Sequence, residues 1–325
     1  MSSAQPPGQP VYDLYAAFPH LTTLRTAVRQ QDWSAVSDFF AALDDDDDVA
    51  TAARTVADTA GADAFLRSAV AERQEGVDAG LARSLLAFRL IRAGWAIRSG
   101  YRAQNVSRDQ FAQFHDHLRR AEQLLIDAVA MEPGHVLGWY LRLMTCRGLE
   151  LGQSEARRRY DRLAAYQPHH FQAQGQLLQQ LCPKWGGSWK AAHAFGRQCR
   201  KNSLPGGLDA LITVEAHLER WMELPTGRQH TYWWAEGVQE ELTGAAEASV
   251  LHPDHRPNMS WIAARSILAA AFSVCGQHGP AAVHFAELGE FAAEYPWDAM
   301  SGRPDALLVR QREAALHAAA SAKKG

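Results

Sequence analysis

Apolar residues recur every three or four positions through most of the chain, beginning at Val11. This spacing places them on one face of an α-helix. The stretch from Leu81 to Trp95 carries the broadest apolar stripe of this kind. No segment alternates apolar and polar residues with the Val, Ile and Thr enrichment of strands. The pattern therefore predicts an all-α protein.

Prolines, glycines and capping residues divide this pattern into segments that we expect to pair as helical hairpins. An early pair spans about 21–43, and a long helix runs from about Asp78 to Ser99. The other expected helices span 49–60, 62–73, 107–132, 135–150, 153–166, 170–181, 188–201, 208–223, 231–250, 259–275, 280–294 and 304–319. The last of them would cap the stack.

Two stretches of the chain follow one template, 35 residues apart. The template consists of three small or apolar positions followed by a proline. Its two copies are Ala121, Leu125, Ala128 and Pro133, and Ala156, Tyr160, Leu163 and Pro168. A period in the mid-thirties is typical of stacked helix pairs. We therefore expect one repeat domain over 11–319, with disordered tails at 1–10 and 320–325.

This template, with Trp139 four places into the repeat that begins after His135, resembles tetratricopeptide repeats. The resemblance implies a solenoid of helical hairpins, a degenerate tetratricopeptide-like array with a C-terminal capping helix. A narrower resemblance covers about 94–200. It is carried by Gly94-Trp95-Ala96, by Arg98-Ser99-Gly100-Tyr101 and by Pro183-Lys184-Trp185-Gly186-Gly187-Ser188. These strings are similar to an uncharacterised bacterial family with a PKWGGS loop, a likeness that implies the fold and no activity.

Composition narrows the classes of partner. The net charge of −3 lacks the basic excess of a general nucleic-acid or membrane-surface binder. The first ten residues lack the basic and apolar regions of a secretory signal, and no run of about 18 apolar residues would span a membrane. The four cysteines form no CxxC pair. We expect a cytoplasmic protein that binds neither nucleic acid nor membranes.

The loop Cys182–Trp189 is the most distinctive segment, because it combines a lysine, two tryptophans and a Gly-Gly pair. In one interpretation its backbone N–H groups and Lys184 bind a phosphate or carboxylate, with Ser188 capping the next helix. In the other, the loop is a specialised turn, and its tryptophans pack between hairpins.

Charged and aromatic runs elsewhere have simpler interpretations. The aspartates at 44–48 suit a solvated loop or a helix N-terminus. Arg157, Arg158 and Arg159, with Arg147 and Arg162, indicate a solvated basic face. The triplet Tyr232-Trp233-Trp234 must turn at least one ring away from the core. The histidines show no HExxH or Glu-x-x-His pattern, so we expect no metal.

We therefore expect a module that binds a protein or peptide in a concave groove, without cofactor or catalytic residues. Basic side chains would meet acidic groups or a C-terminal carboxylate, and aromatic rings would supply apolar contact area. The expected ligand-binding residues are Trp95, Arg98, Tyr101, Trp139, Lys184 and Trp185. The alternative is an enzyme or small-ligand receptor whose pocket is closed by the 182–189 loop.

Overall fold

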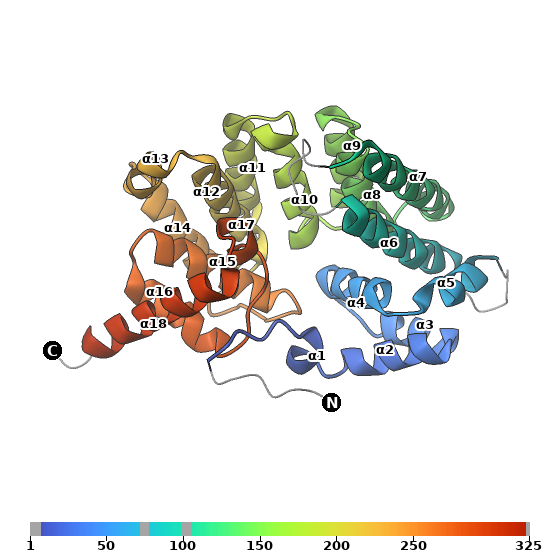
Figure 1. Ribbon diagram of the computed structural model, residues 1–325, viewed down its shortest axis with the longest axis horizontal. Helices are drawn as coiled ribbons and strands as arrows, with labels where there is room; N and C mark the ends of the chain where they lie inside the picture. Colours follow the sequence, from blue (N-terminus) through green and yellow to red (C-terminus); the bar gives the residue numbers. More distant parts are fainter. Residues whose placement is uncertain (1–7, 72–77, 99–105, 323–325) are drawn as a thin grey trace. The chain divides into compact units, whose positions relative to one another are not determined.

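A computed structural model describes residues 8–71, 78–98 and 106–322. Within these ranges the protein is all-helical and contains no β-strand, which confirms the prediction of an all-α protein (Figure 1). Backbone pairing outside helices includes one isolated bridge between Val11 and Phe291. None of the described helices is both long enough and apolar enough to cross a membrane.

The described chain forms two compact units. The N-terminal unit is Phe18–Gly187, and the C-terminal unit combines the residues up to Ala17 with those from Ser188 onward. The single domain over 11–319 stays a prediction. The expectation of disordered tails at 1–10 and 320–325 does not hold for their described residues, 8–10 and 320–322. Helix α18 (Pro304–Ala322) extends into the expected C-terminal tail, and the carbonyl of Gly8 accepts a hydrogen bond from Arg312.

In the N-terminal unit, helices that follow one another in sequence pack together. Its elements are α2 (Leu21–Gln30), α3 (Trp33–Ala41), α4 (Asp46–Asp58), α5 (Ala62–Ala71), α6 (Ala79–Arg98), α7 (Arg108–Met131), α8 (Val136–Gly148), α9 (Gln153–Ala164), α10 (Phe171–Leu181) and the 3-10 turn η2 (Pro183–Trp185). The closest packing joins α6 with α7, α7 with α8, and α8 with α9 (Figure 1). The six apolar positions of the repeat template are all buried.

Capping side chains set where several of these helices begin. Asp45 accepts hydrogen bonds from the amides of Asp47 and Asp48, and so starts α4. The aspartate run therefore forms a helix N-terminus, as predicted, with its negative charges at the positive end of the helix dipole. Ser107 and Gln110 form a reciprocal capping box at the start of α7.

The C-terminal unit is built around α12. Its elements are α1 (Leu14–Ala17), α11 (Trp189–Asn202), η3 (Leu208–Ala210), α12 (Leu211–Glu223), α13 (Thr226–Tyr232), α14 (Val238–Ala248), α15 (Trp261–Val274), α16 (His278–Leu288), α17 (Trp297–Met300) and α18. Helix α12 packs against α11, α14 and α15, and every residue from Leu211 to Glu219 is buried.

Two predicted helices of this unit are shorter than the apolar pattern indicates. The expected helix over 231–250 is divided: α13 ends at Tyr232, and α14 begins after its N-cap Gly237, which takes a left-handed conformation with φ of 79°. The expected helix over 280–294 ends at Leu288, before Gly289 with φ of 59°. Glycine adopts positive φ without the steric cost that other residues have, which explains why α14 begins and α16 ends at these positions.

Candidate functional site

Two of the predicted ligand-binding residues, Trp95 and Trp185, contact each other in the N-terminal unit. Their ring centroids lie 6.5 Å apart, and the rings are nearly perpendicular, at 86°. Trp95 lies in the last turn of α6, whereas Trp185 ends η2, so the fold joins segments that are far apart in sequence. Both side chains are half-buried. Edge-to-face geometry of this kind is favourable for aromatic pairs.

Two arginines complete this arrangement. The guanidinium carbon of Arg98 lies 5.3 Å from the Trp95 ring centroid. The guanidinium of Arg147 lies 5.8 Å from the Trp95 ring and 5.6 Å from the Trp185 ring, so it bridges the two. A cation within about 6 Å of an aromatic face is attracted by the ring quadrupole. We call Trp95, Arg98, Arg147 and Trp185 the tryptophan–arginine cluster.

Arg147 is not one of the expected ligand-binding residues, because the run of arginines indicates a solvated basic face. It occupies the last turn of α8, just before Gly148. Its Nη1 donates to Oε1 of Gln176 at 2.8 Å, and this contact orients the guanidinium. The sequence does carry one sign of this role. Arg147 lies in the last turn of its helix with a glycine close behind it, and Arg98 has a similar position.

Close approach of α6, α7 and α8 places these residues together. A Cβ atom at Gly148 would overlap Leu118 Cδ1 and would lie 2.9 Å from Phe114 Cζ and 3.5 Å from Trp95 Cζ2. Gly148 therefore lets α8 lie against α7 and beneath the Trp95 ring. Phe114 itself contacts Trp95, with ring centroids 4.8 Å apart. The cluster rests on a packed interior rather than on a surface loop alone.

The turn that carries Trp185 is held by its own backbone. The amides of Gly186 and Gly187 donate to the carbonyls of Pro183 and Cys182, at 2.9 and 3.1 Å. A Cβ at Gly187 would overlap the backbone of Leu181, so only glycine fits there. Because both glycine amides are used inside the turn, they do not form the predicted anion cradle. The interpretation as a specialised turn is the one that the geometry favours.

The remaining predicted contacts have different environments. Lys184 lies on η2 with its side chain exposed. Trp139 is 7% exposed, and its indole N–H donates to the carbonyl of Pro133 at 2.9 Å. We therefore assign Trp139 to packing and correct its expected role as a groove residue. Tyr101 lies outside the described residues.

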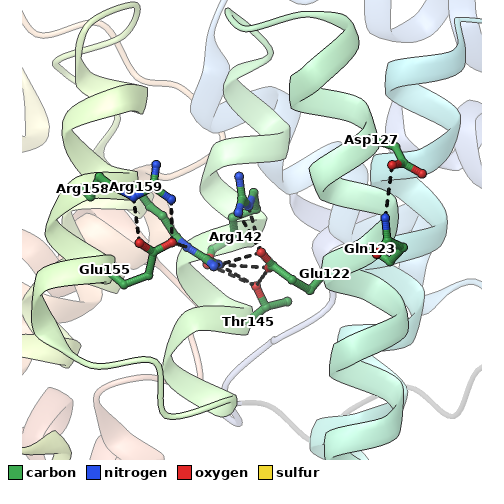
Figure 2. Close-up of polar contacts among 8 residues, drawn as sticks. All are labelled: Glu122, Gln123, Asp127, Arg142, Thr145, Glu155, Arg158 and Arg159. Atoms are coloured by element: carbon green, nitrogen blue, oxygen red, sulfur yellow. Dashed lines mark hydrogen bonds and ion pairs between the residues drawn. The ribbon is translucent and has the colours of Figure 1, made fainter.

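A buried ionic network explains the environment of Trp139 and corrects the predicted basic face. Glu122 of α7 accepts from Arg142 of α8 at 2.8 Å and from Arg159 of α9 at 2.9 Å, and Thr145 also donates to it (Figure 2). All four side chains are buried. Arg159 is only 2% exposed, so it does not belong to a solvated face.

Charge balance makes this network possible in the interior. Arg159 also donates to Glu155, at 2.7 Å, and Arg158 joins Glu155 from the exposed side (Figure 2). Hydrogen bonds from Arg158, opposed in part by burial, lower the pKa of Glu155 to about 2. Burial lowers the pKa of Arg142, whose guanidinium lies over the Trp139 ring at 4.9 Å. Unpaired buried charges are costly, so the network joins α7, α8 and α9 structurally.

The C-terminal unit contains a second polar cluster that sequence reasoning missed. His217 Nδ1 lies 2.8 Å from the Tyr232 hydroxyl, and its Nε2 lies 2.7 Å from Glu241 Oε2. Arg197 donates to the other oxygen of Glu241 at 2.6 Å. The hydrogen bond from His217, opposed in part by burial and supported by the hydrogen bond from Arg197, lowers the pKa of Glu241 to about 2. Because each group is satisfied by its neighbours, the cluster ties α11, α12, α13 and α14 together.

His193 lies beside this cluster and lacks hydrogen bonds. Its ring centroid is 4.7 Å from that of His217, and both of its ring nitrogens are buried without a partner. Burial, reinforced by His217 and by nearby arginines, lowers the pKa of His193 to about 4. No spacing signal in the sequence distinguishes this histidine, because its partners come from other helices.

The aromatic triplet separates as the sequence requires: Trp233 is fully buried and Trp234 is 69% exposed.

Across the described ranges, no group of three or more His, Cys, Asp or Glu side chains could hold a metal ion. Comparison of the chain with known protein families, with curated proteins and with solved structures finds no match to any of them. The proposals below therefore rest on the geometry of the described residues.

Proposed function

We propose that the protein is a binding module for an acidic peptide segment or a free C-terminal carboxylate, and that the tryptophan–arginine cluster makes the contact. Its helices would then be a degenerate tetratricopeptide-like array of hairpins that presents a concave groove. The single observation that carries the proposal is the Trp95–Trp185 contact with Arg98 and Arg147 over the rings.

The chemistry of these residue types supports recognition of a carboxylate. Tryptophan and arginine are enriched among the residues that dominate binding energy at interfaces. A guanidinium stacked on a ring face still has N–H groups along its edge, where a carboxylate binds in a bidentate manner. The half-buried rings of Trp95 and Trp185 supply apolar contact area beside these charges, and exposed Lys184 adds a third cation on the same turn as Trp185.

The geometry also supports a preformed site. Gly148 and the η2 backbone hold the two tryptophans in place, and Gln176 orients Arg147. A site whose side chains are already ordered loses less conformational entropy when it binds. Binding of a peptide needs neither a nucleophile nor a general base, and we assign no catalytic step to the cluster.

The test uses fluorescence anisotropy with labelled peptides that end in two or three acidic residues, in free-acid and C-terminally amidated forms. The Arg98→Ala/Lys184→Ala double variant should weaken binding at least tenfold, and its unfolding free energy should stay within about 1 kcal/mol of the parent protein. Arg157→Ala is the matched control, because Arg157 is a half-exposed arginine of the same unit, paired with Asp161 on α9. The proposal fails if no acidic peptide binds, or if the double variant and the control bind equally.

A further inference from the structure

A cavity of about 320 Å³ lies in the N-terminal unit. Its polar lining comes from Ser37, Asp46, Asp78, Glu132 and His135. Its apolar lining comes from Phe40, Val49, Leu81, Val136 and Leu137. None of these residues belongs to the 182–189 loop or to the tryptophan–arginine cluster, so the cavity is independent of the function proposed above. A concave apolar site with a few convergent polar groups is the usual form of a small-molecule site.

The three carboxylates reach the cavity from three different helix ends. Asp46 lies in the first turn of α4 and accepts from Gln167 Nε2 at 2.8 Å. Asp78 precedes α6 and accepts from the amides of Gly80 and Leu81, at 2.9 and 3.0 Å. Glu132 ends α7, with its side chain 63% exposed. These bonds orient Asp46 and Asp78, and a carboxylate has about four lone-pair sites, which leaves capacity for a ligand.

Gly80 does not itself line the cavity, but it lies close to three of the polar lining residues. A Cβ atom added there would lie 3.3 Å from Asp78 Oδ1, 3.9 Å from Glu132 Oε2 and 3.9 Å from His135 Cε1. Two carboxylates and an imidazole of the lining therefore lie near one another, around the start of α6.

His135 shapes the charge of the cavity. Its Nε2 lies 2.7 Å from the buried Ser84 hydroxyl, and its Nδ1 lies 3.7 Å from Glu132 Oε2. Burial lowers the pKa of His135, although the neighbouring carboxylates oppose this effect. A neutral imidazole does not cancel the negative charge of Asp46, Asp78 and Glu132. The lining is therefore acidic at its polar side and aliphatic or aromatic elsewhere.

We propose that this cavity binds a small organic ammonium compound, a primary alkylamine. Its charged end would lie among Asp46, Asp78 and Glu132, and its aliphatic part would contact Leu81, Val136 and Leu137. An organic cation fits better than a metal ion, because no cluster within the described chain has the arrangement that a metal requires. A hydrated inorganic ion would also make no favourable contact with the apolar part of the lining, because such ions bind oxygen ligands and water.

The test is isothermal titration calorimetry of the full chain with 1,5-diaminopentane, and with 1-pentanol and glutarate as uncharged and anionic probes. The diamine should bind saturably, and the other two probes should not. Nα-acetyl-lysine methylamide is a further probe: if it binds more tightly than the diamine, the ammonium group belongs to a lysine side chain rather than to a free amine. Equal binding of pentanol and the diamine would overturn the proposal.

Two variants and a control locate the site. Glu132→Gln should weaken diamine binding about fivefold, the effect of removing one solvent-exposed charge pair. Asp78→Asn should weaken it by a similar factor, because Asp78 is an exposed carboxylate of the lining and asparagine can still accept the capping hydrogen bonds at the start of α6. Asp116→Asn is the control, because Asp116 is a carboxylate on α7 with a similar side-chain exposure of 60%. If Glu132→Gln and Asp116→Asn bind the diamine equally, the proposal is wrong.

Discussion

Asp47 and His170 are 123 positions apart in the sequence, yet Asp47 Oδ1 lies 2.7 Å from His170 Nδ1 in the interior of the N-terminal unit. The same carboxylate accepts from the amides of Phe171 and Gln172, at 3.0 and 2.9 Å. Asp47 thus belongs to the first turn of α4 and also caps the start of α10. One side chain joins two helices that the sequence separates widely.

Replacing Asp47 by Asn should destabilise the protein by about 3 kcal/mol. An amide NH₂ cannot accept a hydrogen bond, so at least one of the three donors, two of them in buried hydrogen bonds, would lose its partner. Asp44→Asn, in the same acidic run but exposed, should change the unfolding free energy by less than about 0.5 kcal/mol. Urea unfolding followed by circular dichroism measures both values. Equal effects of the two substitutions would contradict the capping role of Asp47.

The Glu122 network gives a second stability prediction. Glu122→Gln would leave the guanidinium groups of Arg142 and Arg159 in the interior without their shared anion. Removing one partner of a buried ion pair costs about 3–5 kcal/mol. Arg158→Ala removes only an exposed partner of Glu155 and should cost about 1 kcal/mol or less. Thermal unfolding of the two variants should therefore differ clearly, and similar melting temperatures would refute the structural role assigned to Glu122.

Most helix positions could be predicted because local signals determine them. The apolar spacing, Pro133, Pro168 and capping residues such as Ser107 all act within a few residues of a helix end. The two predicted helices that were too long in the C-terminal unit fail for a local reason as well. An apolar pattern continues through Gly237 and Gly289, whereas the positive φ of these glycines sets the start of α14 and the end of α16.

The candidate site could be predicted only in part. Trp95, Arg98 and Trp185 were recognisable as unusual residues at helix ends, but their contact depends on how α6, α8 and η2 pack. The burial of Arg159 was not predictable from spacing, because consecutive arginines on α9 look alike until Glu122 of α7 is placed beside one of them. Pairing between distant helices is a tertiary property that a single sequence does not encode locally.

The lowered pKa of His193 should make the unfolding free energy depend on pH. Its pKa is about 4 in the folded protein and near 6.5 when exposed, so the unfolded chain binds a proton that the folded chain does not. Stability should therefore fall as the pH decreases from 6.5 to 4, with a slope of up to about 1.4 kcal/mol per pH unit from this group. The charged or titratable neighbours that contribute are His217, Arg220, Arg197 and Glu241.

The variant His193→Leu should remove this part of the pH dependence. Leucine has a similar volume, and the histidine ring makes no hydrogen bond that would be lost. Urea midpoints at pH 5 and pH 7.5 should differ less in the variant than in the parent protein. His317→Leu is the control, because His317 is exposed on α18 of the same unit. If the midpoints at the two pH values differ as much in His193→Leu as in the parent protein, the pKa of His193 is not lowered in the folded state.

A pair of glycines tests the packing beneath the tryptophan–arginine cluster. Both Gly148 and Gly279 lie in helices, where alanine is favoured over glycine by up to about 1 kcal/mol. At Gly148 the added methyl would overlap Leu118, and overpacking of a filled interior costs about 1–3 kcal/mol. At Gly279 it would meet no atom within 4 Å.

Gly148→Ala should therefore destabilise the protein, and Gly279→Ala should leave it equally stable or slightly more stable. Because the new methyl at residue 148 would press on Phe114 and on the Trp95 ring, Gly148→Ala should also change the tryptophan emission and weaken binding of the acidic peptide. Gly279→Ala should do neither. If Gly148→Ala were as stable as the parent protein and bound the peptide normally, the close approach of α6, α7 and α8 would not be what positions Trp95.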